Sequence, residues 1–176
     1  MNRAIFLDRD GVINKSIVVD GKPHPPSSVN ELIIFEEVET CVSELKKIGF
    51  EIVVVTNQPD ISRGKTSFET VNEINNLIRK KTKINNFYIC PHDELDNCPC
   101  RKPRIGLIRQ AASELNIDLQ GSYMVGDRWR DIEAGQDAGC KCFFINFEYL
   151  EKLPSPPFIE VGSLTEATRI IIEDYK

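Results

Sequence analysis

Short apolar runs of strand length alternate with segments of helical periodicity along this chain, and this alternation restricts its possible folds. The five runs are residues 4–7, 51–56, 87–89, 123–125 and 142–145. Helices are predicted at residues 35–47, after a capping box of Thr66 and Glu69, at 105–115, at 132–138, and after Ser163 and Glu166. Repeated strand–helix units imply a mainly parallel sheet covered on both faces. The predicted fold is therefore α/β, a three-layer Rossmann-like sandwich that forms a single domain over residues 1–176.

Size and charge restrict the partners of such a domain. The 176 residues are 41% hydrophobic, which is enough to form a core without disulfides. A net charge of −5 argues against a nucleic-acid partner, since such proteins carry a basic surface. No apolar run approaches the ~18 residues of a membrane span, and Arg3 and Asp8 bring charge too early for a signal peptide. We therefore expect a cytoplasmic monomer that binds neither nucleic acid nor membrane.

Acidic residues follow two of the predicted strands. Asp8 and Asp10 come after the first apolar run, where Gly11 allows the chain to turn. Asp127 follows the fourth run, and Asp131 lies four residues further on. An Asp-rich turn with solvated carboxylates is the alternative for the first pair, and Asp131 also suits the positive end of a helix. Because strand ends of a parallel sheet meet at one edge, however, these carboxylates predict an oxygen-rich Mg²⁺ site suited to phosphoryl transfer.

A histidine and three of the six cysteines lie within eleven residues. Cys90 and His92 precede a short polar segment, and Cys98 and Cys100 follow it. Three thiolates and one imidazole are a complete tetrahedral set for a structural Zn²⁺, with no position left for a catalytic water. The alternatives are ordinary buried cysteines or a transient disulfide. We predict a zinc-binding loop, while Cys41, Cys140 and Cys142 are predicted to pack in the core.

With these residues in place, the chain resembles the haloacid dehalogenase superfamily of phosphohydrolases. Residues 8–12 (DRDGV) match the first motif of that superfamily, and Thr56 after an apolar strand matches the second. Lys102 matches the third motif, and residues 126–131 (GDRWRD) match the fourth. The four motifs occur in the family's order over residues 4–146.

The resemblance assigns a role to each matched residue. It implies that Asp8 is the nucleophile, forming an aspartyl-phosphate, and that Asp10 is the general acid and then the general base. It further implies that Thr56 and Lys102 hold the phosphate oxygens, although each could also be an ordinary strand-end or surface residue.

The resemblance also implies a metal-binding set. Asp8, the backbone carbonyl of Asp10 and Asp127 would bind Mg²⁺, with Asp131 orienting the ligands.

The cysteine loop runs directly into Arg101 and Lys102, which is similar to the branch containing heptose-bisphosphate and histidinol-phosphate phosphatases. The chain lacks a large insertion for a cap domain, as that branch does. The same resemblance implies that Asn57, Gln58, Arg63 and Arg101 contact the substrate.

The leading hypothesis is removal of the 7-phosphate from a D-glycero-D-manno-heptose 1,7-bisphosphate, a small phosphorylated sugar. Histidinol phosphate or another small sugar phosphate is the alternative substrate, and a nucleic-acid 3′-phosphatase is disfavoured by the acidic balance. A catalytically silent binding module is a further alternative. The sequence leaves the roles of two residues undecided. His24 could contact the substrate or be solvated, and Trp129 could line the site or cover a helix.

Overall fold

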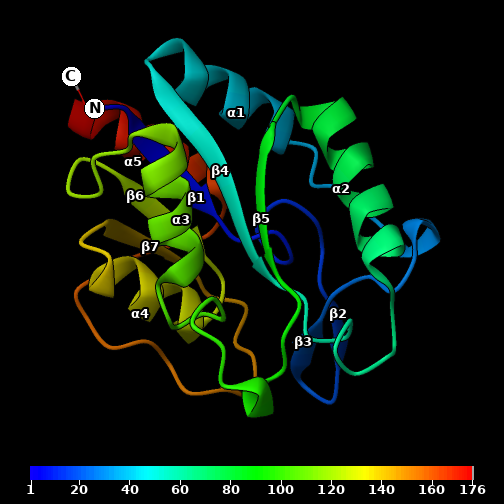
Figure 1. Cartoon of the computed structure of the whole chain (residues 1–176). Coiled ribbons are helices and arrows are strands. Elements are labelled where there is room, and N and C mark those ends of the chain that lie inside the picture. Colours follow the sequence, from blue (N-terminus) through cyan, green and yellow to red (C-terminus); the bar gives the residue numbers. More distant parts are fainter. Residues whose placement is uncertain (176) are drawn as a thin grey trace.

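A six-stranded sheet, with every neighbouring pair parallel, forms the centre of the computed structural model, which describes residues 1–175 (Figure 1). Its order is β5 (Asn86–Cys90), β4 (Phe50–Asn57), β1 (Arg3–Leu7), β6 (Tyr123–Gly126), β7 (Lys141–Ile145) and β8 (Ile159–Val161). The predicted α/β class is confirmed. The five predicted strands are present, and β8 is an additional edge strand. It carries no apolar run, because only Val161 of its three residues is buried.

Helices cover both faces of the sheet, which confirms the three-layer sandwich (Figure 1). One face carries α1 (Val38–Lys47), α2 (Phe68–Thr82) and α5 (Leu164–Tyr175), and the other carries α3 (Gly106–Leu115) and α4 (Trp129–Asp137). Successive side chains of β1 point to opposite faces of the sheet, so this strand contributes to two hydrophobic cores. Ile5 and Leu7 pack under the first group of helices, while Ala4 and Phe6 pack under the second.

Three helix starts differ from the prediction, and the first is α1, which begins at Val38 instead of residue 35. The N-cap of α2 is Ser67, whose hydroxyl accepts a hydrogen bond from the backbone N–H of Thr70 at 3.1 Å, so the predicted capping box of Thr66 and Glu69 is wrong by one residue. Ser and Thr are adjacent here and both are good caps, which is why sequence alone does not choose between them. Helix α4 begins at Trp129 instead of residue 132, and this places Asp131 in its first turn.

A β-hairpin that the sequence analysis does not predict lies between β1 and α1. Strands β2 (Ile17–Val19) and β3 (Lys22–His24) pair antiparallel, followed by the 3-10 turn η1 (Val29–Glu31). Asp20 and Gly21 connect them with φ of 50° and 73°, and two positive φ values are what a tight two-residue hairpin turn requires. Only this hairpin and η1 lie between β1 and α1, so no cap domain is inserted there.

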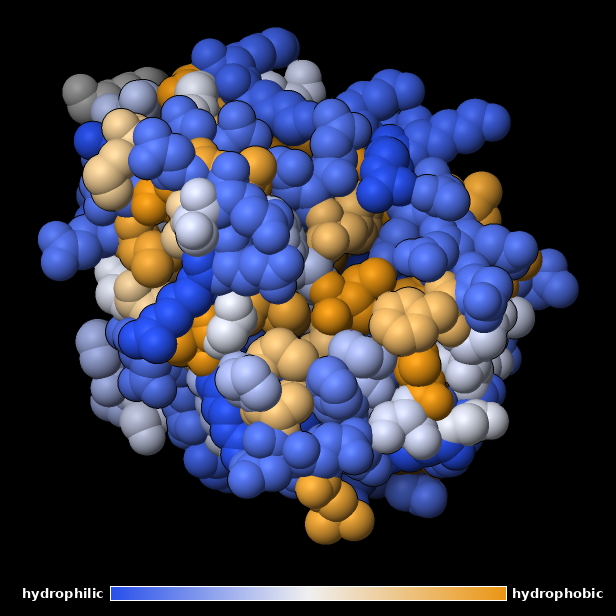
Figure 2. Space-filling model, viewed as in Figure 1, coloured by the Kyte–Doolittle hydropathy of each residue, from blue (hydrophilic) through white to orange (hydrophobic). Residues whose placement is uncertain are grey.

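The surface seen from the side of Figure 1 is mostly hydrophilic, and its apolar side chains lie in separate groups (Figure 2). Within residues 1–175, none of the helices has the length and apolar content needed to cross a bilayer.

Candidate active site

Three carboxylates meet at the carboxyl ends of β1 and β6. Asp8 follows β1, Asp127 follows β6 and Asp131 lies in the first turn of α4; all three are buried, with carboxylate oxygens within 4.8 Å of one another. Glycines permit this approach. A Cβ on Gly126 would lie 2.1 Å from the Cβ of Asp131, and one on Gly11 would lie 1.9 Å from an oxygen of Asp127.

Lys102 connects two of these carboxylates. Its buried Nζ lies 2.7 Å from Asp8 Oδ1 and 2.7 Å from Asp131 Oδ1, and it also donates to the carbonyl of Val55 at 2.6 Å. Burial alone lowers the pKa of Lys102, but the negative charges of Asp131 and Asp8 outweigh burial and raise that pKa. The lysine therefore stays protonated beside the carboxylates.

The acid cluster carries more negative charge than Lys102 neutralises. Burial raises the pKa of Asp8 to about 7; Lys102 opposes this rise, and Asp131 and Asp10 add to it. Burial, together with Asp8 and Asp131, also raises the pKa of Asp127. Asp127 Oδ1 is buried with no hydrogen-bond partner among the residues that the structure describes. A free oxygen in an oxygen-only cluster fits a hard divalent cation such as Mg²⁺.

The side chain of Asp10 lies apart from this cluster and is fixed by three donors. Arg9 reaches it through Nε at 3.2 Å and Nη2 at 3.0 Å, Asn14 Nδ2 donates at 2.9 Å, and Gln58 Nε2 donates at 2.7 Å. Arg9 is completely buried, and its Nη1 donates to Asn75 of α2 at 3.1 Å. Asp10 also lines the pocket at the sheet edge, so these three donors fix an acidic residue at the site.

The three residues at the end of β4 have different surroundings. Thr56 is buried, and its hydroxyl accepts from Gln58 Nε2 at 2.9 Å. Gln58 is only 1% exposed and does not line the pocket, so the structure places it beneath the site and beside Asp10. Asn57 does line the pocket, while its amide binds the backbone of Lys102.

Cys90, His92, Cys98 and Cys100 come together at the end of β5. Five of the six pairs of Sγ and Nδ1 atoms lie 3.1 to 3.6 Å apart, and all four ligand atoms lie within 4.8 Å of one another. Ligand atoms at the usual distances from a tetrahedral Zn²⁺ are roughly 3.3–3.8 Å from one another, so the set fits this metal. All six cysteines, each within the described residues, are free of disulfides.

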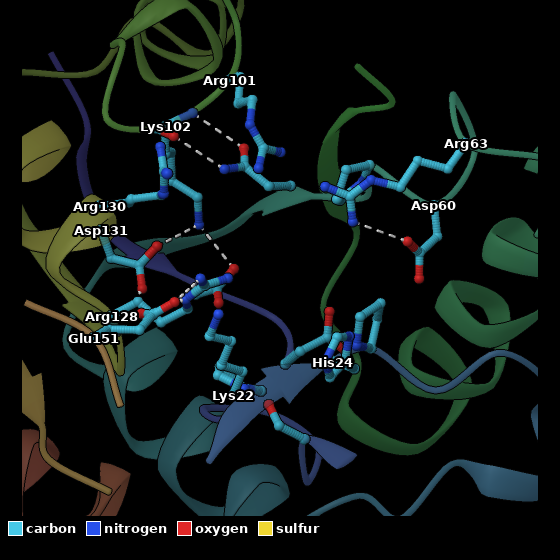
Figure 3. A pocket seen from close by; sticks show the side chains of 17 residues that line it. Lys22, His24, Asp60, Arg63, Arg101, Lys102, Arg128, Arg130, Asp131 and Glu151 are labelled. Carbon is cyan, nitrogen blue, oxygen red and sulfur yellow. Dashed lines mark hydrogen bonds and ion pairs between the residues drawn. The ribbon is translucent and has the colours of Figure 1, made fainter. Parts of the chain in front are cut away.

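The pocket beside these groups is lined by residues from several loops. Figure 3 shows Lys102, Arg101 and Arg130 on one side, Arg63 and Asp60 on another, and Lys22 and His24 of the hairpin below them. His24 therefore lines the pocket. Trp129 does not; its ring packs under Lys152, with Nζ at 3.7 Å from the ring centroid.

Sequence reasoning missed several residues of this site. Tyr149, in the loop after β7, donates from its hydroxyl to Asp127 Oδ2 at 2.9 Å. Glu151 of the same loop pairs with Arg128. The aspartate–glycine pair at positions 20 and 21 was an available signal for the hairpin, whereas nothing in the sequence marks Tyr149 as a partner of Asp127.

The parallel sheet, the carboxylates at its strand ends and the buried lysine between them define a hydrolase of the haloacid dehalogenase class. A family model described as HAD-hydrolase-like matches residues 99–147. A D-glycero-alpha-D-manno-heptose-1,7-bisphosphate 7-phosphatase of Photorhabdus laumondii is 34% identical over 96% of this chain and 96% of its own. A D-glycero-beta-D-manno-heptose-1,7-bisphosphate 7-phosphatase of Escherichia coli K12 is 40% identical over 74% of this chain and 72% of its own.

Among solved structures, a D,D-heptose 1,7-bisphosphate phosphatase from B. bronchiseptica, complexed with magnesium and phosphate, superposes with a TM-score of 0.85. It is 26% identical and covers 98% of this chain and 99% of its own. The chain belongs to the heptose-1,7-bisphosphate 7-phosphatase family within the haloacid dehalogenase superfamily, and it is a phosphoric monoester hydrolase.

Proposed function

We propose that the protein removes the 7-phosphate of a D-glycero-D-manno-heptose 1,7-bisphosphate. Two relatives, matched over 96% and 72% of their own length, are named for this substrate and support the proposal. The observation that carries the chemistry is the contact of Lys102 Nζ with Asp8 at 2.7 Å, inside a pocket that carries further cations. A buried carboxylate that is paired with a lysine and faces a cationic pocket is arranged to attack a phosphate ester.

In the proposed reaction, a carboxylate oxygen of Asp8 attacks phosphorus while the bond from phosphorus to the sugar oxygen breaks. Asp10 gives its proton to that oxygen. Water then attacks the aspartyl-phosphate, its proton passes to Asp10, and the bond from phosphorus to Asp8 breaks to release phosphate. The three donors around Asp10 hold its carboxylate in place through both steps.

Two metals complete the proposal. Asp8, Asp127, Asp131 and the backbone carbonyl of Asp10 would hold Mg²⁺, which supplies positive charge to the phosphate oxygens when bound. The hydroxyl of Thr56 and the ammonium of Lys102 would also hold the phosphate oxygens.

Cys90, His92, Cys98 and Cys100 would hold a structural Zn²⁺. The zinc site would fix the loop that positions Arg101 and Lys102. Arg63, Arg101 and Asn57 line the pocket and are the proposed substrate contacts.

We also propose that the enzyme acts as a monomer in the cytoplasm. Free thiols and a thiolate metal site suit a reducing compartment. The acid cluster and the cysteine site each draw their ligands from one chain. Analytical ultracentrifugation tests the monomer directly.

The test is phosphate release from both anomers of the heptose bisphosphate, from histidinol phosphate and from p-nitrophenyl phosphate. We expect kcat/KM to be highest for one heptose anomer, and a preference for histidinol phosphate would overturn the assignment. Asp8→Asn should abolish release from every substrate while the thermal unfolding temperature stays close to that of the wild type. Activity that survives in Asp8→Asn would exclude the proposed nucleophile.

A further inference from the structure

Arg9 is a fully buried cation beside the carboxylate of Asp10. Its guanidinium binds both oxygens of that carboxylate: Nη2 donates to Oδ1 at 3.0 Å and to Oδ2 at 3.1 Å, and Nε donates to Oδ1 at 3.2 Å. Within residues 1–175 this is the one ion pair that Arg9 makes. Of the three side chains that donate to Asp10 in the described structure, Arg9 is therefore the one with a positive charge.

The other end of the guanidinium is held by helix α2. Arg9 Nη1 donates to Oδ1 of Asn75 at 3.1 Å, and both side chains are buried. An arginine side chain has many rotamers, so contacts on two sides of the planar group are needed to fix its orientation. Without Asn75, the guanidinium would be held mainly by its contact with Asp10 and could turn about it.

Asn75 is a costly residue for its position on α2. The buried face of this helix is mostly apolar, and the other buried polar residue, Thr82, donates its hydroxyl to the carbonyl of Ile78 in the same helix at 2.8 Å. Nδ2 of Asn75, by contrast, is buried without a partner in the described part of the chain. An apolar side chain would pack there without that cost, so the contact with Arg9 is the reason for an amide at this position.

We propose that Asn75 is a positioning residue for the general acid. Asn75 orients Arg9, and Arg9 in turn keeps the carboxyl group of Asp10 in the position from which it gives its proton to the leaving oxygen of the substrate. Asn75 does not line the pocket, so it acts on the reaction only through Arg9. The role of Asp10 rests on the proposed function, whereas the series of contacts from α2 to Asp10 rests on the distances above.

The test uses two substrates whose leaving groups differ in their need for a proton. When the bond from phosphorus to the sugar oxygen of heptose 1,7-bisphosphate breaks, the electron pair stays on an alkoxide that Asp10 must protonate. In contrast, p-nitrophenyl phosphate releases a phenolate that is stable without a proton. Because kcat/KM covers the steps up to the loss of the leaving group, it measures this proton transfer separately from the later attack of water.

Asn75→Leu removes the acceptor for Arg9 while keeping a side chain of similar size. We expect kcat/KM for heptose 1,7-bisphosphate to fall about tenfold, which is part of the ~100-fold or more that a placed general acid contributes. The value for p-nitrophenyl phosphate should change by less than about twofold, because its leaving group needs no acid. An equal decrease for both substrates would indicate a general loosening of the site and overturn the proposal, as would unchanged values for both.

A matched control lies on the same helix. Asn76→Leu makes the same substitution at an exposed position of α2, where the amide also accepts a hydrogen bond from an arginine, Arg79, and both kcat/KM values should stay at those of the wild type. Thermal unfolding shows whether Asn75→Leu is folded. If it is not, Asn75→Ser takes its place, since the shorter side chain withdraws the acceptor from Arg9. An unchanged ratio of the two kcat/KM values in Asn75→Ser would then overturn the proposal.

Asp10→Asn separates this inference from the proposed function. If Asp10→Asn lowers kcat/KM for both substrates equally, the assigned general acid is wrong and the role of Asn75 is overturned with it. If Asp10→Asn selectively lowers the value for heptose 1,7-bisphosphate, the acid is correct, and adding Asn75→Leu to it should cause no further loss, because Asn75 acts through Asp10. A further loss in the double variant would overturn the inference alone. If the wild type hydrolyses no heptose phosphate, the substrate assignment fails, and the same ratios are measured with fructose 6-phosphate as the alkyl ester.

Discussion

Asn57 binds both backbone groups of Lys102. Its Oδ1 accepts from the backbone N–H of Lys102 at 3.0 Å, and its Nδ2 donates to the carbonyl of Lys102 at 3.1 Å. This pair of hydrogen bonds ties the end of β4 to the loop after the cysteine site. The ammonium of Lys102 can therefore keep its place between Asp8 and Asp131.

Asn57→Ala should reduce kcat by about tenfold or more, because two backbone groups lose their partners and the Lys102 loop loosens. The measurement is steady-state release of phosphate at saturating substrate. Asn72→Ala, an exposed position on α2, is the matched control and should retain wild-type kcat. A wild-type kcat in Asn57→Ala would mean that the loop is held by other contacts.

Gln58→Leu should lower kcat while leaving KM close to that of the wild type. The Gln58 amide donates to Asp10 at 2.7 Å and to Thr56 at 2.9 Å from beneath the pocket, so its loss disorients the acid without removing a substrate contact. We expect a decrease in kcat of about tenfold, the value of one lost hydrogen bond to a charged group. A rise in KM with unchanged kcat would instead support the substrate contact that the family resemblance implies.

Removal of Zn²⁺ should lower both stability and activity. Arg104 Nη1 donates to the carbonyl of Cys98, and the backbone N–H of Gly106 donates to Pro99 at 3.2 Å, so the cysteine loop is attached to the start of α3. Metal analysis should find one Zn²⁺ per chain, and Cys98→Ser should lose it together with several degrees of thermal stability. Cys41→Ser, in the core, should keep its zinc. Full zinc content in Cys98→Ser would contradict the assigned ligand set.

Tyr149→Phe should weaken Mg²⁺ binding several-fold. The Tyr149 hydroxyl occupies Asp127 Oδ2 at 2.9 Å and leaves Oδ1 as the free oxygen, so its loss lets the carboxylate rotate. Isothermal titration with Mg²⁺ measures the affinity without turnover. Tyr88→Phe removes a comparable 2.7 Å hydrogen bond to Glu114, which is not part of the acid cluster, and should bind Mg²⁺ as the wild type does. Equal affinities in both variants would remove Tyr149 from the site.

The parts of this fold that follow from sequence are those with local signals. Asp8 and Asp127 could be placed because each directly follows an apolar run, and buried parallel strands end at a common edge. The four zinc ligands could be grouped because they are close in sequence. Strand β8 could not, since an edge strand of three residues with one buried side chain has no recognisable pattern.

The orientations of several site side chains depend on tertiary contacts, which a local sequence pattern does not predict. Arg9 is an arginine beside two acids, which suggests a solvated residue, yet it is fully buried against α2. Gln58 turns toward Asp10, and Tyr149 reaches Asp127 from a loop 22 residues further along the chain. Such roles become visible only when the strands that carry the residues are assembled.

The pocket draws its lining from Asp8 near the start of the chain to Glu151 near its end, and the backbone N–H of Leu150 binds the carbonyl of Gly21 in the hairpin at 2.8 Å. No partial segment of the chain can reproduce that lining, so a ligand in the pocket binds the folded chain and not an unfolded one. Occupancy is consequently linked to the folding equilibrium of the whole protein. A substrate or product at a hundred times its Kd would add about 2.7 kcal/mol to the free energy of unfolding, so that the metabolite level itself would set how resistant the enzyme is to degradation.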